Sequence, residues 1–227
     1  MGKKTIPQEL AYVIGMTALA FGGALMARAD FGVSMVVAPA YVLHLKLSQT
    51  MSWVTFGVMT YMLEALLLLV LGLVLRRFTI NYLLSFVTAF LFGELLDGFM
   101  FVTSFLEGAG IPVRVVCFLV GMPLEAFGVA NMFRTYFAPE AYEMVVKELA
   151  DRYHWDIGKT KTTYDFISSG VAVLLSFAFF GLWHFEGVKL GTILCTIVNG
   201  TMISLIGKWL DRRFEFKRIL HLKKKKD

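Results

Sequence analysis

Long apolar runs dominate the pattern of hydrophobic and polar positions along this chain. Six of them reach the roughly 20 residues that a helix needs to cross a bilayer. They lie at about 9–27, 51–75, 79–105, 111–132, 163–185 and 188–210. Apolar residues fill these runs instead of forming a stripe along one helical face, which is typical of membrane spans. The pattern therefore predicts an all-α polytopic membrane protein with six transmembrane helices.

A seventh apolar stretch, Phe31–Leu47, is shorter and contains Pro39, His44 and Lys46. Its length would just reach across the hydrocarbon, so a seven-span arrangement is one interpretation. A re-entrant or interfacial helix is the other, since proline and charged groups are tolerated where protein or water covers them.

Composition excludes a water-soluble globule. Of the 227 residues, 57% are hydrophobic and only 17% are charged, and the mean hydropathy is +0.68. Too few polar side chains remain to cover a soluble surface of this size. Cys117 and Cys195 both lie inside apolar runs, so neither a disulfide framework nor a zinc-binding spacing is available.

The distribution of Lys and Arg predicts the orientation. With six spans and both termini in the cytoplasm, 18 of the 22 basic residues lie on the cytoplasmic side. With seven spans the number is 17, so charge does not separate the two arrangements. Both place the C-terminal tail, residues 212–227, in the cytoplasm.

That tail carries the excess positive charge. From Lys208 to Asp227 there are nine basic and three acidic residues, against a net charge of +5 for the whole chain. Aromatic and aliphatic residues alternate with the basic ones, which predicts an interfacial helix on anionic lipids. A segment tethered beside a bilayer is a poor fit to nucleic acid, so we expect no nucleic-acid partner.

An internal repeat is the most specific feature of the sequence. Gly15–Phe31 matches Gly121–Phe137 without gaps at an offset of 106 residues, and nine of the 17 positions are identical. Arg28 coincides with Arg134. Shared membrane composition explains matching Ala and Phe, but not the register of Gly, Met and Arg. We therefore divide one membrane domain into repeat one, residues 9–107, and repeat two, residues 111–211.

The repeat bears on topology through its connectors. It pairs Phe31–Leu47 with Phe137–Trp155. The segment 142–152 in the second connector is too charged to span the membrane, and as an amphipathic helix it would lie along the interface or re-enter. Each half then holds three spans and one short re-entrant or interfacial helix after its first span. Because three is odd, the second half is inverted, an architecture found in many secondary transporters. The repeat thus favours six spans.

Several short motifs resemble a known family. Gly23-Ala24-Leu25 precedes Ala29-Asp30-Phe31-Gly32-Val33-Ser34, then Leu43 and Leu47-Ser48, while the second half has Ala138-Pro139 and Leu190-Gly191-Thr192-Ile193. This arrangement resembles the YczE/YyaS/YitT-like bacterial integral membrane proteins. The resemblance implies a transporter-like fold in the bacterial cytoplasmic membrane, and it implies no substrate and no catalytic residues.

Carboxylates inside the predicted spans are the first candidates for function, because ionisable groups in hydrocarbon are costly. They are Glu64, Glu94, Asp97 and Glu125, and Asp165 opens the sixth span. Glu94 and Asp97 share one helical face at spacing i, i+3. Such groups could bind a cation or a proton. Alternatively Asp97 is solvated, and Glu64 and Glu94 are bonded to neighbouring spans.

Arg28 and Arg134 occupy equivalent positions before the two connectors, where a guanidinium beside a helix N-terminus would form an anion site. The alternative is a topogenic or lipid-contacting role. Asn131 and Asn199 are uncharged polar groups inside spans. They could orient a ligand, although interhelical hydrogen bonds are commoner.

These features predict a secondary transporter or exporter of a small solute, proton-coupled through a midplane acidic site between the repeats. The alternative is a non-transporting subunit or scaffold, or a substrate-capturing component of a larger complex, using Glu140–Lys161 and the tail. We expect no enzymatic activity, metal or cofactor, because no catalytic or ligand spacing is present. The expected partners are the bilayer, anionic lipids at the tail and the solute; small-residue faces also permit a homodimer.

Overall fold

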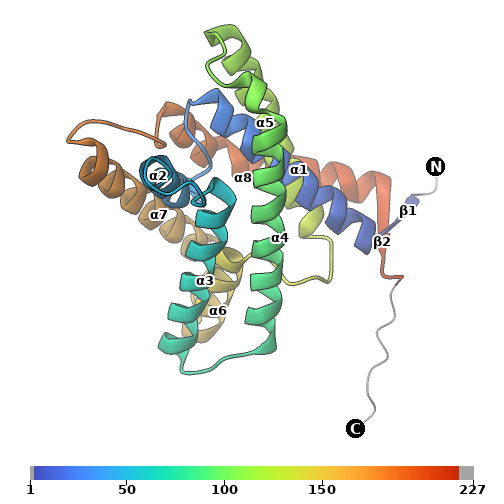
Figure 1. Ribbon diagram of the computed structural model, residues 1–227. Coiled ribbons are helices and arrows are strands. Elements are labelled where there is room, and N and C mark those ends of the chain that lie inside the picture. Colours follow the sequence, from blue (N-terminus) through green and yellow to red (C-terminus); the bar gives the residue numbers. More distant parts are fainter. Residues whose placement is uncertain (1–2, 220–227) are drawn as a thin grey trace.

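The computed structural model describes residues 3–219, in which six helices are long and apolar enough to cross a membrane (Figure 1). The six are α1 (Gln8–Ala29), α3 (Phe56–Leu75), α4 (Ile80–Val102), α5 (Ile111–Met132), α7 (Ile157–Phe180) and α8 (Leu190–Arg213). The shorter elements are β1 (Lys4–Pro7), α2 (Ala38–Leu47), the 3₁₀ turn η1 (Ser104–Leu106), α6 (Ala141–Tyr153) and β2 (Phe214–Lys217). The prediction of six helices able to cross a membrane is confirmed, and these helices indicate a multi-pass membrane protein.

The seventh apolar stretch does not form a span. Its helical part, α2, has ten residues and is about 15 Å long at 1.5 Å per residue, half of what a hydrocarbon core requires. Pro39 lies in the first turn, where its missing N–H costs no helical hydrogen bond. The residues before it form turns that contact other helices, so they do not extend the helix.

Local capping explains where the helices begin and end. The Thr55 hydroxyl accepts a hydrogen bond from the N–H of Val58 at the start of α3. In the same way Asp156 accepts from Lys159, so α7 begins at Ile157, earlier than the apolar run that starts near residue 163. Asp30 ends α1 in the left-handed conformation, with φ of 54°.

The helices α1 and α5 cross at close range through their glycines. A Cβ atom added to Gly15 would lie 2.9 Å from the carbonyl oxygen of Gly128, and one added to Gly22 would lie 2.7 Å from that of Gly121. Only residues without a side chain allow two backbones to approach this closely. The glycines of the sequence repeat therefore serve helix packing.

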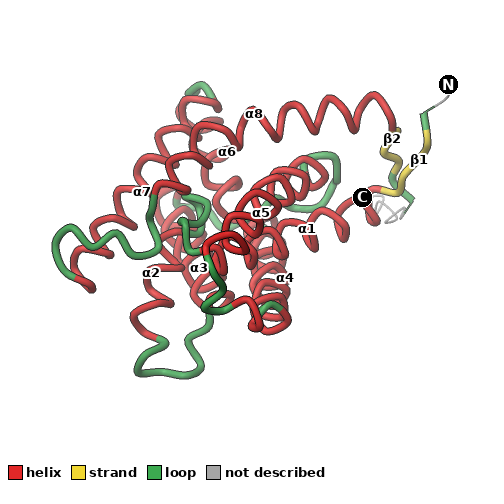
Figure 2. The backbone as a smooth tube through the Cα atoms, turned by 90° about the horizontal axis from the view of Figure 1, so that it is seen from above, coloured by secondary structure: helices red, strands yellow, loops and turns green. Residues whose placement is uncertain are grey.

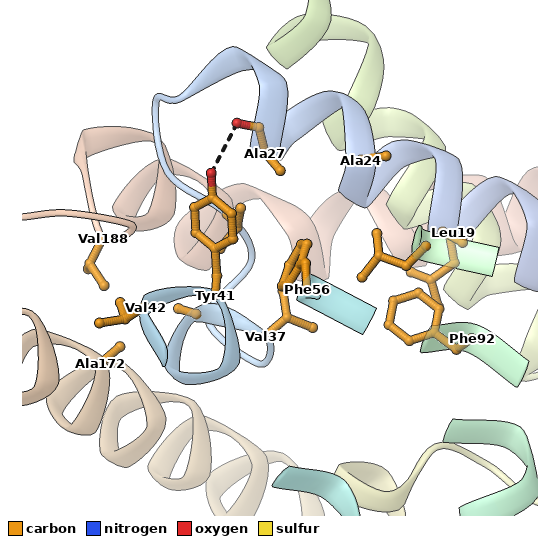
Figure 3. Close-up of a cluster of buried hydrophobic side chains, with 14 of the residues drawn as sticks. Leu19, Ala24, Ala27, Val37, Tyr41, Val42, Phe56, Phe92, Ala172 and Val188 are labelled. Carbon is orange, nitrogen blue, oxygen red and sulfur yellow. Dashed lines mark hydrogen bonds between the residues drawn. The ribbon is translucent and has the colours of Figure 1, made fainter. Parts of the chain in front are cut away.

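The largest apolar core lies where α1 meets the connector before α2 and the helices α3 and α4. Figure 3 shows Leu19 of α1 beside Phe92, and Tyr41 of α2 beside Phe56. The Tyr41 hydroxyl donates a hydrogen bond of 3.3 Å to the carbonyl of Ala27, which ties α2 to α1. This core anchors the short helix inside the protein.

The remaining helices are arranged around that core. In Figure 1, α3 and α4 run side by side, and α2 is seen almost end-on between α3 and α7. The second short helix, α6, packs against α3, α4 and α7. Its buried face includes Tyr142 and Val145, while Lys147 and Asp151 are exposed on the other. The apolar face of the amphipathic segment 142–152 thus packs against other helices of the protein.

The two ends of the described chain lie together. Strand β1 pairs in parallel with β2, with Thr5 opposite Glu215, and Figure 2 shows the pair where α1 begins and α8 ends. The predicted interfacial helix of the tail is wrong for Phe214–Lys217, because these residues are extended and hydrogen-bonded to β1. Residues 220–227 of the predicted tail lie outside the described part.

Large apolar side chains cover the outer faces of the six long helices. Leu69 and Leu73 on α3, Phe101 on α4, Leu119 on α5 and Ile197 on α8 are all more than half exposed. A soluble monomer rarely exposes continuous apolar surface on this scale. The outer surface therefore fits contact with lipid tails.

Candidate functional site

A cavity of about 260 Å³ lies between α5, α7 and α8, closed on one side by the loops before α2 and α6. Apolar side chains line part of it, among them Leu19 and Phe92 from the first half of the chain. The polar lining consists of Ser34, Glu125, Glu140, Lys161, Thr162, Asp165, Thr196 and Asn199. Residues from both halves therefore form its walls.

Three carboxyl groups and one ammonium group face this cavity among the described residues. Glu125 belongs to α5, Glu140 caps the start of α6, and Lys161 and Asp165 lie on the first turns of α7. Glu125 and Glu140 are only 5% and 6% exposed. Burying this many carboxyl groups around one Lys is unfavourable unless protons or a bound cation compensate them.

Several oxygen atoms at the cavity have no hydrogen-bond partner. They are Oε1 of Glu140, Oδ1 of Asp165 and Oδ1 of Asn199, and Oε2 of the neighbouring Glu64 is a fourth. Buried polar atoms are nearly always paired in proteins, by protein, water or ligand. All four are oxygens, which accept hydrogen bonds in the amide and in the ionised carboxyl groups.

Glu64 connects α3 to the start of α6. Its carboxyl group accepts a hydrogen bond from the backbone N–H of Ala141, the first residue of α6, and it lies close enough to Glu140 for the two charges to interact. A carboxylate at a helix N-terminus is stabilised by the unpaired N–H groups there. Glu64 thus holds α6 in position beside the cavity.

Among the residues that the structure describes, Lys161 is the one cation on the cavity wall. Its Nζ lies 3.8 Å from Oδ2 of Asp165 and 5.0 Å from the centre of the Tyr142 ring. The Tyr142 hydroxyl donates a hydrogen bond of 3.0 Å to Glu143. Lys161 therefore compensates part of the negative charge and leaves the rest unbalanced.

The carboxyl groups of the α6 segment have raised pKa values. Burial raises the pKa of Glu140 well above its ordinary value, and the nearby Glu64, Glu143 and Glu125 add to this, whereas Lys161 lowers it. Burial also raises the pKa of Glu143 to about 7, against the lowering effects of Lys161 and the Tyr142 hydroxyl. Protons therefore bind to this segment near neutral pH.

The structure brings some of the predicted carboxylates to the cavity and leaves others away from it. Glu125 lines it, Glu64 is buried beside it, and Glu94 is exposed on the outer face of α4. Asp97 accepts hydrogen bonds from the Thr55 hydroxyl and, at 2.7 Å, from the N–H of Gly57. Asp97 thus secures the start of α3.

The two arginines form structural contacts with helix ends. Arg28 donates to the carbonyl oxygen of Met100 at 2.6 Å and pairs with Glu107 at 3.0 Å. Arg134 forms two hydrogen bonds of 2.7 Å with Asp211 and also donates to the carbonyl of Ala130. Both guanidinium groups make ion pairs and hydrogen bonds within the protein, although Nε of Arg28 is buried without a partner among the described residues, so these contacts favour structure over capture of an anion.

The two asparagines differ in their surroundings. Asn131 is buried at the crossing of α1 and α5, next to Gly15. Its side-chain amide donates a hydrogen bond of 2.9 Å to the carbonyl oxygen of Phe127. This bond within its own helix is structural. Asn199 faces the cavity with its oxygen unpaired.

Sequence reasoning missed Glu140 and Lys161 as site residues and gave Asp165 no assigned role in the site. Glu140 follows Ala138-Pro139 in a connector, and Lys161 and Asp165 share a helical face at spacing i, i+4. Charges at the mouth of a span are ordinarily read as solvated. Only the packing of α6 against α7 turns them inward.

Metal ions in proteins require groups of His, Cys, Asp and Glu side chains as ligands. Within residues 3–219, no group of three or more such side chains is placed to hold a metal ion. Cys117 and Cys195 are both buried free thiols.

Comparison with known proteins places the chain in one family. Residues 6–208 match the "Family of unknown function (DUF6198)". The chain belongs to this family. No curated protein and no solved structure matches the chain. DUF6198 has no assigned activity, so the resemblance to YczE/YyaS/YitT-like proteins stays a prediction.

Proposed function

We propose that this DUF6198 protein is a secondary transporter or exporter of a small solute, coupled to protons, with its binding site in the acidic cavity. The observation that carries the proposal is the cavity itself. It lies among helices long enough to span a membrane, and Glu140, Asp165 and Asn199, each with one buried unpaired oxygen, line it. Ionisable groups in such surroundings are typical of substrate and proton pathways.

An inverted repeat supports the proposal, and the crossing of α1 and α5 supports the inverted repeat. At the offset of 106, Gly15 corresponds to Gly121 and Gly22 corresponds to Gly128. Gly15 packs on Gly128, and Gly22 packs on Gly121. Each glycine thus contacts the counterpart of the other, which is the pattern of contacts around a two-fold axis.

Contacts elsewhere repeat this exchange. Arg28 bonds near the end of α4, and its counterpart Arg134 bonds near the end of α8. The Phe31 carbonyl accepts from the N–H of Gly191 in α8, and the Ala138 carbonyl accepts from Thr88 in α4. Both short helices, α2 and α6, pack against α3 and α7. We interpret them as the half-inserted connectors of two inverted halves.

The two halves differ in one respect that suits alternating access. α3 packs along α4, whereas the described residues of α7 and α8 make no contact of similar extent, and the cavity separates them. In a transporter with inverted repeats, the opposite state exchanges the conformations of the two halves. We infer that α7 and α8 close while α3 and α4 separate, so that the site faces the other side.

Proton coupling follows from the α6 segment. The pKa of Glu143 is about 7, and the pKa of Glu140 is also raised. Groups that gain and lose protons near neutral pH can exchange a proton for a solute as the halves move. Glu125 faces the same cavity as Glu140, and its charge adds to the rise in the pKa of Glu140.

The proposal also includes location and partners. The excess of basic residues near both ends favours a bacterial cytoplasmic membrane with both termini in the cytoplasm. The pairing of β1 with β2 keeps the termini on one side, as an even number of spans requires. We expect the basic tail to contact anionic lipids.

A scaffold that docks partners through Glu140–Lys161 is less well supported. Glu140 and the apolar face of α6 are buried against other helices of the same chain, so only the exposed part of this segment, mainly residues 151–156, is accessible to a partner. Transport therefore remains the function that the geometry favours.

The test uses purified protein in liposomes with a pH difference across the membrane. An extract of small bacterial metabolites is added, and mass spectrometry identifies any solute that accumulates or leaves. We expect flux with the wild type and with Glu94→Gln, whose side chain is exposed outside the cavity. Glu125→Gln should reduce flux to that of protein-free liposomes. Equal flux with Glu125→Gln, or none with the wild type, would overturn the proposal.

A further inference from the structure

We infer that the cavity selects a small organic cation, an ammonium or guanidinium group on an apolar body. This substrate class rests on the proposed function and extends it. The inference comes from the balance of charges at the wall, the orientation of unpaired atoms and the mixture of polar and apolar lining.

The charge balance favours a cation. Glu125, Glu140 and Asp165 face the cavity, and Lys161 is the one basic side chain on its described wall. Lys161 lies beside Asp165 and above the Tyr142 ring, so its charge is directed at groups of the protein itself. An anionic ligand would meet uncompensated carboxylates, which is costly in a site of low dielectric constant.

The unpaired atoms favour a ligand that donates hydrogen bonds. Glu140 is 6% exposed and its Oε1 has no partner, although the residue lines the cavity. Asp165 and Asn199 also line the cavity, and although these residues are only partly buried, the Oδ1 atom of each is buried without a partner. An ammonium group carries three N–H donors and no acceptor, and a guanidinium group carries five. Either supplies the donors that these oxygens lack.

The size and lining favour an organic ligand over a bare metal ion. About 260 Å³ is several times the ~30 Å³ that one water molecule occupies in the liquid. Leu19, Phe92 and Ile203 line the same space and offer apolar contact. In addition, the described residues contain no group of three or more carboxylates, histidines or cysteines placed to ligate a metal. A cation with a hydrocarbon body fits both kinds of wall.

The experiment compares three probes of similar shape in binding to the purified full-length protein. Phenethylammonium is the cation, 2-phenylethanol the neutral probe and phenylacetate the anion, and binding is followed by the shift in thermal unfolding at pH 8. We expect phenethylammonium alone to raise the unfolding midpoint. A larger shift with phenylacetate or 2-phenylethanol would overturn the inference.

Two variants locate the binding at this wall. Asp165→Asn removes one acceptor charge and should weaken phenethylammonium binding about tenfold or more. Lys161→Gln removes the competing cation and should strengthen the binding of phenethylammonium. A general loss of protein stability would not produce this effect. Glu94→Gln is the control and should bind as the wild type does. Unchanged affinity in both Asp165→Asn and Lys161→Gln would contradict a cation site here.

Binding and flux separate the two proposals. Phenethylammonium binding without flux of any solute in liposomes would refute transport and keep the cation site. Transport of an anionic or neutral solute that cations do not inhibit would support the transporter proposal and refute the cationic substrate class.

Discussion

Gly128 lies so close to Gly15 that a Cβ atom added to it would come within 2.6 Å of the Gly15 carbonyl oxygen. This contact joins α1 to α5, one turn from Glu125 on the same helix. The position of Glu125 in the cavity wall therefore depends on glycines that have no side chain and take no part in binding. Several measurable consequences follow from this and from the other contacts described above.

Substitution of the crossing glycines should destabilise the protein. Gly128→Ala places a methyl group against backbone, and overpacking of this kind costs about 1–3 kcal/mol. Gly200→Ala is the matched control, because nothing lies within 4 Å of its Cβ position. In a helix it should be neutral or stabilise by up to about 1 kcal/mol. Thermal unfolding in detergent checks both, and equal losses would contradict the close approach.

The pairing of the chain ends predicts a short distance between residues 5 and 215. Thr5 and Glu215 are partners in the β1–β2 register. In a variant with alanine at Cys117 and Cys195, Thr5→Cys with Glu215→Cys should be joined by a short bifunctional thiol reagent. A membrane-impermeant thiol label should reach both positions from the same side only. Labelling of the two positions from opposite sides would refute six spans.

An ion-pair network at Asp30 should contribute modest stability that depends on salt. Asp30 lies 2.9 Å from Nη2 of Arg114 and 2.6 Å from Nζ of Lys189, joining the end of α1 to α5 and α8. Asp30→Asn retains a residue that tolerates the left-handed backbone and should cost about 1 kcal/mol, because all three side chains are partly exposed. The difference from wild type should shrink at high salt. A loss independent of salt would argue against an electrostatic role.

The raised pKa values predict how stability changes with pH. The pKa of Glu143 rises from 4.5 in the unfolded chain to about 7 in the folded protein, and the pKa of Glu140 is also raised. The folded state therefore binds more protons than the unfolded state, so the free energy of unfolding falls as pH rises from about 4.5 through 7. Thermal unfolding at pH 5 and pH 8 measures this. Glu143→Gln should lessen the fall, and an unchanged slope would contradict the assignment.

The affinity for a cation should rise with pH, whereas the free energy of unfolding falls. As the carboxyl groups lose protons, phenethylammonium should bind more tightly at pH 8 than at pH 6. Parallel trends of stability and cation affinity with pH would contradict exchange of a proton for the cation.

Alternating access predicts that α3 and α4 must separate during transport. The rings of Tyr61 and Phe90, whose centres are 5.3 Å apart, connect the two helices. In the variant without native cysteines, Tyr61→Cys with Phe90→Cys should lose flux when a cleavable bifunctional reagent joins the helices, and regain it on reduction. The single-cysteine variants treated in the same way are the controls. Flux that survives the cross-link would refute this movement.

The spans could be predicted from sequence because hydrocarbon thickness sets a length that a run of apolar residues either reaches or does not. The run at 111–132 coincides with α5, Ile111–Met132. The start of α7 was placed too late because Asp156, a cap, extends the helix into a charged segment. The tail was predicted as a helix because its composition does not show that β1 provides a hydrogen-bonding edge.

The site could be predicted only in part. A carboxylate in a span is costly wherever it lies, so Glu64, Glu94 and Glu125 are equal candidates in the sequence. Packing alone distinguishes them, since Glu125 faces the cavity, Glu64 caps α6 and Glu94 is exposed. For the same reason Glu140 and Asp165 could not be recognised, because their burial depends on α6 folding back against α7.

By itself, the sequence predicted the six helices that are long and apolar enough to cross a membrane, because hydrophobic length is a local property. Only the tertiary structure decided which charges share a cavity and which oxygens remain unpaired. Those features depend on side chains far apart in the chain, such as Glu125 and Asp165, which meet only when helices pack.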